Sequence, residues 1–167
     1  FNVPDCLSTH VRAINDMSGI HAFFDSSWTA PRSHCGYGVW YCGGPIAYGS
    51  RKLNVIADSS ALAEYAAGSL CSKELSFVRH LLRELHAEIK GPIVVAADNT
   101  ASISISEKNG VTKLTKHFDF CVARLRHEVQ HNCVLLHHVG TDDQTADIFT
   151  KALDEKTFLH HRGAFFS

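Results

Sequence analysis

The stretch that organises this sequence is Ile93-Val94-Val95-Ala96-Ala97-Asp98-Asn99, a short apolar run that ends in an acid. The run is too short for an independent helix and carries β-branched side chains, so it predicts a buried strand. A strand that is apolar on both faces is typical of a parallel sheet covered by helices. Open α/β sheets bind ligands at the carboxyl ends of such strands, and Asp98 stands at that end. On this stretch alone, Asp98 has two interpretations: a cap of the next helix or a ligand-binding acid.

The composition is that of one domain of ordinary size. The chain has 167 residues and a formal net charge of -1, so no global basic field indicates a nucleic-acid partner. Such a partner would need a local basic patch, metal ions or a neighbouring domain. The six cysteines include no Cys-x-x-Cys pair, so we expect reduced, intracellular thiols. The sequence has no run of about 18 apolar residues, no signal-peptide pattern and no initiator Met, which predicts a cytoplasmic fragment of a longer protein without a membrane segment.

The apolar patterns predict an α/β fold, a five-stranded mixed sheet with helices on both faces. Strands are expected at residues 20–25, 35–42, 46–50, 93–97 and 133–139. Helices are expected at residues 61–86, 100–108 and 115–131, with a last one that starts at Asp142 or Asp143 and runs to about Leu153. Short hairpins join the first three strands, so we expect a three-strand antiparallel meander plus two parallel strands. Residues 1–18 are expected to be a linker, 19–160 the domain and 161–167 a C-terminal tail.

Four acids fall near strand ends or helix starts. Asp25 and Asp98 end the first and fourth strands, and Glu64 and Asp147 lie near the starts of the long helix and the last helix. If the first and fourth strands are neighbours, these acids converge, and their charges repel one another unless a cation binds. Oxygen ligands suit Mg²⁺ or Mn²⁺, and two such ions about 4 Å apart promote phosphodiester hydrolysis. The alternative for Glu64 is a favourable interaction with the helix dipole.

The twelve histidines raise the question of a transition-metal site. His127 and His131 are one helical turn apart, a spacing at which two histidines can chelate zinc. A zinc site would need a third and a fourth ligand, and the sequence offers only Cys121 and Cys133 for these places. Both are expected on a different helix face or element from the two histidines. We therefore expect no zinc site here, and interpret the histidines at 160–161 as surface residues.

Five short motifs follow one another at the spacing of a known family. The stretches are Asp25-Ser26-Ser27-Trp28, Ser59-Ser60-Ala61-Leu62-Ala63-Glu64-Tyr65, Asp98-Asn99-Thr100-Ala101-Ser102-Ile103, Thr115-Lys116-His117-Phe118-Asp119 and Thr145-Ala146-Asp147-Ile148-Phe149-Thr150-Lys151. They resemble, in the same order, D-A-D-W, S-S-T-E-A-E-Y, D-N-Q-S-A-I, T-K-H-I-D and A-D-[IL]-x-T-K. These are motifs of the ribonuclease H domain in copia-type (LTR) retrotransposon reverse transcriptase polyproteins.

The resemblance implies an RNase H-like fold and a metal-dependent endonuclease that hydrolyses the RNA strand of RNA–DNA hybrids during reverse transcription. The catalytic and metal-binding residues it implies are Asp25, Glu64, Asp98 and Asp147, which would hold two Mg²⁺ ions, with Mn²⁺ as a substitute. It also implies a reverse transcriptase domain in the same polyprotein, a virus-like-particle setting and no small-molecule cofactor. The alternatives are a catalytically weak or inactive hybrid-binding module, and an integrase-like DNA strand-transfer domain.

Departures from the family motifs leave the four acids untouched. Ser26-Ser27 replaces A-D, Ala61-Leu62-Ala63 replaces T-E-A, and Leu114 stands where a basic residue is frequent. The departures concern positions that would contact substrate.

The residues expected to contact substrate are Asn99, Lys113, Lys116, His117 and Arg124. The lysines, Arg124 and its neighbour Arg126 give a local positive excess, which is either a phosphate-binding patch or an ordinary solvated helix face. His117 either contacts the nucleic-acid backbone or bonds to a neighbour at the helix start.

Overall fold

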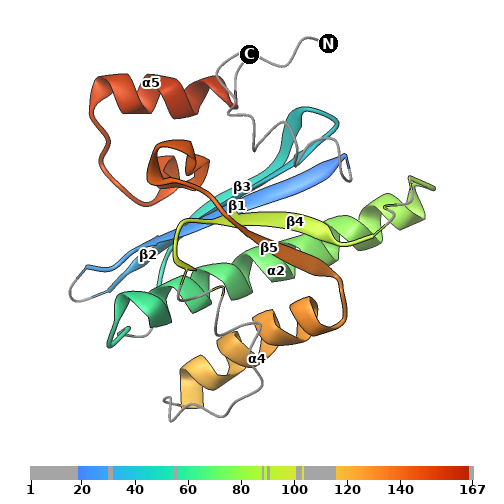
Figure 1. The fold of residues 1–167 in the computed structure, drawn as a ribbon, viewed down its shortest axis with the longest axis horizontal. Helices are drawn as coiled ribbons and strands as arrows, with labels where there is room; N and C mark the ends of the chain where they lie inside the picture. Colours follow the sequence, from blue (N-terminus) through green and yellow to red (C-terminus); the bar gives the residue numbers. More distant parts are fainter. Residues whose placement is uncertain are drawn as a thin grey trace.

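The computed structural model describes residues 19–29, 32–54, 56–87, 89, 91–100, 103 and 116–165, with the backbone alone at 116–118. Five strands form one sheet in the order β3-β2-β1-β4-β5 (Figure 1). The strands are β1 (Ile20–Ser27), β2 (His34–Tyr41), β3 (Gly44–Lys52), β4 (Ile93–Ala97) and β5 (Val134–His138). The first three are antiparallel, while β4 runs parallel to β1 and β5 parallel to β4. This confirms the predicted mixed sheet.

Strand β4 lies inside the sheet because every residue of it is apolar. All five side chains from Ile93 to Ala97 are buried, and the strand hydrogen-bonds β1 on one side and β5 on the other. The register pairs Phe23 of β1 with Ala96 of β4. Two residues further along each strand stand Asp25 and Asp98, so the predicted neighbourhood of the first and fourth strands is confirmed.

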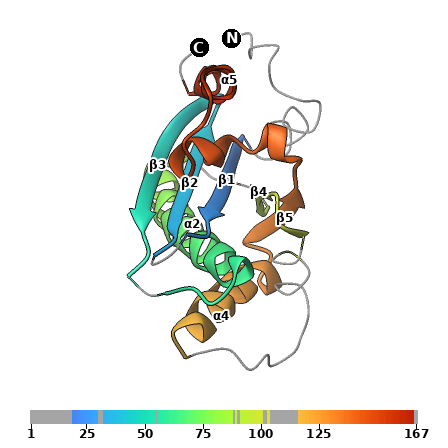
Figure 2. The ribbon, with the colours of Figure 1, turned by 90° about the vertical axis from the view of Figure 1, so that its left-hand side faces the viewer.

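Two helices, α2 (Ser60–Glu84) and α4 (Lys116–Gln130), cover one face of the sheet (Figures 1 and 2). The Ser59 side chain caps α2 by accepting a hydrogen bond from the Leu62 backbone N–H at 3.3 Å. Gly68 allows close packing, since a Cβ there would lie 2.9 Å from Leu125 and 3.1 Å from Phe24. The large core fills the space between these helices and the sheet.

The other face carries the short helices η1 (Thr141–Asp143) and η2 (Thr145–Phe149) and the helix α5 (Glu155–Gly163) (Figure 1). They cover a smaller core that comprises Phe23, Trp40, Val94, Ala96, Val139 and Ala146, with Ala164 and Phe165 against it. The Trp40 and Phe165 rings have centroids 4.7 Å apart, so residues beyond 160 contribute to this core.

The predicted last helix from Asp142 or Asp143 to about Leu153 is wrong. Two 3-10 helices occupy most of this stretch, and the α-helix begins only at Glu155, where Asp154 caps it. The reason is Gln144, whose backbone is not helical (φ -77°, ψ 85°) and interrupts a continuous helix. Its side chain donates a 3.0 Å hydrogen bond to the Phe24 carbonyl oxygen, so contact with β1 outweighs local helix formation.

The prediction of a surface pair at 160–161 is also wrong for one residue, because His161 is only 2% exposed. Several predictions lie outside the described residues: the linker at 1–18, most of the helix at 100–108, Lys113, and the side chains of Lys116 and His117. In the described part of the chain, no helix is long and apolar enough to cross a membrane.

Candidate metal centre

Three carboxylates meet at the carboxyl ends of β1 and β4. Asp25 belongs to β1, Asp98 follows β4, and Asp147 lies in η2. One ligand oxygen from each lies within 4.8 Å of the others. Asp25 and Asp147 are buried and Asp98 is half-buried. Of the described residues, only these three form a group of acid, histidine or cysteine side chains close enough to share an ion.

Glu64 stands beside this group on the second turn of α2 and is 5% exposed. Its Oε1 accepts hydrogen bonds from the Ser26 backbone N–H (3.2 Å) and the Ser26 hydroxyl (2.8 Å). Its Oε2 is buried without a hydrogen-bond partner among the described residues. Burial, and then the charge of Asp25, raise the pKa of Glu64 to about 8.

The chain that follows η2 returns to Asp25. Lys151 Nζ lies 2.8 Å from Asp147 Oδ1 and 3.5 Å from Asp25 Oδ1, and the Thr150 hydroxyl donates to Asp25 Oδ2. Even so, burial raises the pKa of Asp147 to about 6, and burial followed by the charge of Asp25 raises the pKa of Asp98. One ammonium group therefore leaves the carboxylates with unbalanced negative charge.

These donors fit a hard divalent cation. The ligand set consists of carboxylate oxygens, which suit Mg²⁺ or Mn²⁺ better than zinc. The buried Oε2 of Glu64 has no hydrogen-bond donor recorded to satisfy it, and a cation would supply the missing partner. Burial is the main cause of the raised pKa values of Glu64, Asp98 and Asp147, and the negative charge of Asp25 raises each of them further. A cation would offset both causes, because it favours the charged carboxylates.

The residues that hold the acids in place are not among the predicted site residues. Gln144 is fully buried and bridges η2 to β1, because its side chain donates to the Phe24 carbonyl oxygen and accepts from the Ala146 backbone N–H at 3.4 Å. Thr150 and Lys151 belong to the Thr145–Lys151 motif, which could have pointed to them. Ser26 departs from the family motif and donates two hydrogen bonds to Glu64.

Two of the residues predicted to contact substrate have described side chains, and they lie in different places. Asn99 follows Asp98 at the carboxyl end of β4 and is half-buried. Arg124 instead faces α2, where it donates to the Ser76 hydroxyl at 3.1 Å and pairs with Glu128 at 3.6 Å. Asn99 therefore lies beside the clustered acids, because it directly follows Asp98 in the chain. The recorded contacts of Arg124 are to Ser76 and Glu128 and not to these acids.

The histidines considered for zinc form no such site among the described residues. The His127 and His131 rings stack with centroids 4.0 Å apart. His131 Nδ1 donates to the His127 carbonyl oxygen at 2.9 Å, which occupies that ring nitrogen. His138, at the end of β5, donates through Nε2 to the Asp98 carbonyl oxygen at 3.1 Å, a contact that ties β5 to the end of β4.

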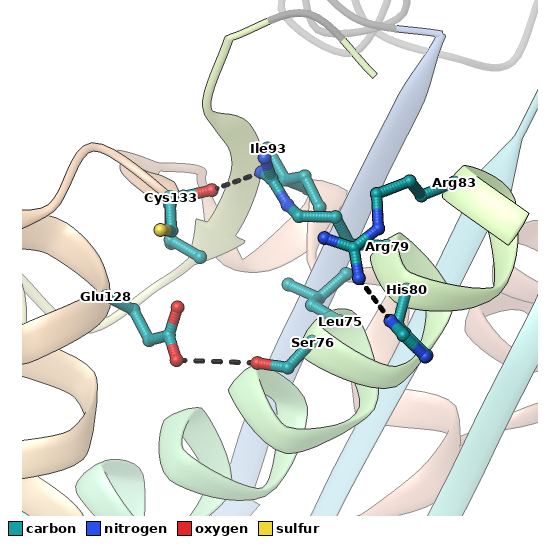
Figure 3. Close-up of a pocket in the computed structure, with 9 residues that line it drawn as sticks. Leu75, Ser76, Arg79, His80, Arg83, Ile93, Glu128 and Cys133 are labelled. Atoms are coloured by element: carbon teal, nitrogen blue, oxygen red, sulfur yellow. Dashed lines mark hydrogen bonds between the residues drawn. The ribbon is translucent and has the colours of Figure 1, made fainter. Parts of the chain in front are cut away.

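A separate hollow of about 270 Å³ lies at the opposite end of the parallel strands. The residues that line it include Ile93 and Val134, which begin β4 and β5, and Arg79 on α2 (Figure 3). Arg79 donates to the carbonyl oxygens of Cys133 (2.8 Å) and Gly91 (3.4 Å). None of the clustered carboxylates lines this hollow.

Sequence comparison finds relatives among transposon polyproteins. The chain is 31% identical over 143 residues to the Retrovirus-related Pol polyprotein from transposon RE2 of Arabidopsis thaliana, a match that covers 83% of this chain and 10% of that polyprotein. It is 28% identical over 127 residues to the corresponding polyprotein from transposon TNT 1-94 of Nicotiana tabacum, which covers 76% of this chain and 10% of the relative. The chain thus spans about a tenth of the length of these relatives. No family model matches the chain.

Solved structures share the fold at low sequence identity. RNase H1 from the halophilic archaeon Halobacterium salinarum NRC-1 superposes with a TM-score of 0.57 at 17% identity, covering 78% of this chain and 93% of that one. LC11-RNase H1 in complex with RNA/DNA hybrid gives 0.55 at 14% identity, over 78% and 93%. The foamy viral protease-reverse transcriptase in complex with RNA/DNA hybrid gives 0.53 at 13% identity, covering 100% of this chain and 22% of that one. The predicted fold class is therefore confirmed.

Proposed function

Because this chain is a homologue of the Pol polyproteins of copia-type transposons and has the RNase H fold, we propose that it is a metal-dependent ribonuclease H. Its reaction is endonucleolytic hydrolysis of the RNA strand of RNA–DNA hybrids during reverse transcription. Two of the structural relatives were solved with an RNA/DNA hybrid, which supports this substrate class.

The observation that carries the proposal is the convergence of Asp25, Asp98 and Asp147 within 4.8 Å. These three acids and Glu64 would hold two Mg²⁺ ions, with Mn²⁺ as a substitute. Glu64 would contribute its buried Oε2, to which no described residue donates a hydrogen bond. When bound, such ions activate water and stabilise the attacking and leaving oxygens of a phosphodiester.

The remaining residues of the site orient the acids. Ser26 fixes one oxygen of Glu64, and Thr150 fixes one oxygen of Asp25, so the two carboxylates present defined lone pairs. Asp98 is the most open of the three clustered acids, which suits an approach of the scissile phosphate from its side. Because RNA and DNA strands differ in the 2′-hydroxyl, selection of the RNA strand rests on contacts to that group.

Substrate binding would involve Asn99, Lys113, Lys116, His117 and Arg124. Asn99 is next to Asp98 and within reach of nucleotides around the scissile bond. Arg124 is engaged with Glu128 and Ser76, so it would contact phosphate only by exchanging these partners. Near-neutral net charge fits a domain that shares substrate binding with a partner. That partner is a reverse transcriptase domain of the same polyprotein, in the cytoplasm or within a virus-like particle.

The test is cleavage of an end-labelled RNA–DNA hybrid by the chain with Mg²⁺, with Mn²⁺ and with chelator. We expect cleavage of the RNA strand with either ion, none with chelator, and a loss of about 1,000-fold in rate for Asp98→Asn. Lys73→Met, an exposed substitution on α2, is the matched control and should cleave normally.

Three results would contradict parts of the proposal. Unchanged cleavage by Asp98→Asn would show that Asp98 is not a catalytic metal ligand. Hybrid binding without Mg²⁺ uptake or cleavage identifies the catalytically inactive hybrid-binding module instead, and cleavage of duplex DNA but not of hybrid identifies a strand-transfer nuclease.

A further inference from the structure

Lys151 has a position that the proposed reaction does not use. Its ammonium group lies between two of the three clustered carboxylates, 2.8 Å from Asp147 and 3.5 Å from Asp25. Asp147 and Lys151 are four residues apart, but the chain between them leaves η2 at Phe149, so the pair is not held by a continuous α-helix. The contact to Asp25 joins positions 126 residues apart and depends on the tertiary fold.

The oxygens that Lys151 contacts are the oxygens a cation would need. Both contacts are to Oδ1 atoms, while Asp25 Oδ2 already accepts from the Thr150 hydroxyl. A Mg²⁺ ion requires ligand oxygens at about 2.1 Å in near-octahedral geometry. An ammonium and a divalent ion that share the same carboxylate oxygens at such distances repel each other strongly, because the site is partly removed from water.

We propose that Lys151 is a built-in counter-cation, which neutralises Asp25 and Asp147 in the metal-free protein and is displaced from them when a divalent ion binds. This inference rests on the proposed function in one respect: the ion is the Mg²⁺ or Mn²⁺ of the nuclease. Lys151 is thus a positioning residue for the carboxylates and sets how tightly the site binds metal.

The side chain of Lys151 has a way out of the site. It is 35% exposed, whereas the carboxylates of Asp25 and Asp147 are 2% and 6% exposed. Its ammonium is carried on a flexible four-carbon stem, so it can move into water while the backbone of residues 147–151 stays in place. The Thr150 contact continues to hold Asp25 after Lys151 has left, so displacement does not release the acid.

The main test measures Mg²⁺ affinity by calorimetry, with no nucleic acid present, for the unmodified chain, Lys151→Met, Lys151→Arg and Lys73→Met. Lys151→Met removes the charge but keeps the apolar stem, Lys151→Arg keeps the charge, and Lys73→Met removes an exposed lysine of α2. We expect Lys151→Met to bind Mg²⁺ about tenfold more tightly, and the other two variants to stay close to the unmodified chain. In the metal-free state, Lys151→Met should lose several degrees of Tm relative to Lys73→Met.

A second measurement does not depend on a variant folding. In the unmodified chain labelled with ¹³C at lysine Cε, the Lys151 resonance should shift as Mg²⁺ is added, while the Lys73 resonance should not. Equal or weaker Mg²⁺ affinity of a folded Lys151→Met, or an unmoved Lys151 resonance at saturating Mg²⁺, overturns the inference.

These outcomes separate the inference from the proposed function. If Mg²⁺ binds and displaces Lys151 but the hybrid is not cleaved, the nuclease assignment fails and the counter-cation role stands. If the hybrid is cleaved but Lys151→Met leaves Mg²⁺ affinity unchanged, the nuclease assignment stands and the counter-cation role fails. If no variant takes up Mg²⁺, both are overturned.

Discussion

At the amino end of β4, Arg79 and Glu128 each contact groups that complement their charge. Glu128 accepts a hydrogen bond from the Ser76 hydroxyl (Figure 3). Arg79 donates to the carbonyl oxygens of Cys133 and Gly91, and Glu128 also pairs with Arg124. At the carboxyl end of the same strand, acids gather around Asp98, and a single lysine balances two of them. Both ends are built on one rigid five-residue strand, so the difference does not come from the backbone.

The difference identifies where the sequence sacrifices stability. Natural sequences satisfy local rules nearly everywhere and break them where a site must do chemistry. The amino end follows those rules at Arg79 and Glu128, since both side chains have hydrogen-bonding partners. The carboxyl end breaks them, because one buried oxygen of Glu64 has no hydrogen-bond partner in the described part of the chain and the pKa values of Asp98 and Asp147 are raised. If the acids at the carboxyl end served only to stabilise the fold, each would be expected to have an oppositely charged or hydrogen-bonding partner.

The largest effect is expected at the carboxyl end, from Glu64→Gln. Because the pKa of Glu64 is raised to about 8, its carboxyl supports the fold fully at low pH and loses that contribution as the pH rises through about 8. Without metal, the free energy of unfolding of the Gln variant should therefore rise relative to that of the unmodified chain between pH 5 and pH 9, by on the order of 3–5 kcal/mol. Urea unfolding in chelator over this pH range measures the gain.

The same Glu64→Gln variant should lose hybrid cleavage by about 100-fold or more, because a neutral amide is a poor ligand for a hard cation. Stability that does not depend on pH in this comparison would show that Glu64 is not strained in the metal-free protein. Retained cleavage would remove it from the metal site.

A smaller effect with the opposite pH dependence is expected from His21, near the amino end of β1. Burial lowers the pKa of His21 from 6.5 to about 4, so the unfolded chain binds a proton where the folded chain does not. The contribution of His21 to stability is complete above about pH 6.5 and is lost as the pH falls towards 4, by up to about 3 kcal/mol. His21→Phe, which keeps a ring against Trp40, should remove this slope in urea unfolding between pH 7 and pH 4. An unchanged slope would assign the acid sensitivity to other groups.

Gln144→Leu should cost about 2 kcal/mol in the free energy of unfolding, because it leaves the buried Phe24 carbonyl and the Ala146 N–H without this partner. Gln144 fixes η2 against β1, so the variant should also weaken Mg²⁺ binding by releasing Asp147 from its position beside Asp25. Urea unfolding and calorimetry measure the two effects. A loss of stability with unchanged Mg²⁺ affinity would show that Asp147 is positioned by other contacts.

The smallest effect is expected at the amino end, from Arg79→Met. The variant loses the charge-assisted hydrogen bonds to Cys133 and Gly91, which should cost about 1–2 kcal/mol while cleavage stays unchanged. Arg83→Met is the matched control on the same helix, since Arg83 is exposed and its recorded side-chain contact is to the neighbouring His80. That control should change stability by about 0.5 kcal/mol or less. Loss of cleavage in Arg79→Met would show that the two ends of β4 are coupled.

Much of the fold was predictable because its signals are local. The apolar run at Ile93–Ala97 predicts the interior strand β4, and the hairpin at Gly43-Gly44 predicts the meander, which β1, β2 and β3 confirm. The stretch after Thr141 was not predictable, because Gln144 interrupts its helical pattern. The Gln144 side chain bonds to Phe24, which lies 120 residues away in the sequence. His161 was misjudged for a similar reason, because only the docking of α5 buries it.

The sequence by itself determined which acids the chain carries at the ends of its strands, and their spacing along five motifs, because residue identity and local periodicity are properties of short segments. The tertiary structure alone decided that Asp25, Asp98 and Asp147 meet within 4.8 Å and that Lys151 bridges Asp25 and Asp147. It also buried one oxygen of Glu64 where none of the residues that the structure describes donates to it. The physical reason is that electrostatic coupling depends on distance and burial, which are fixed only when β1, β4 and η2 pack together.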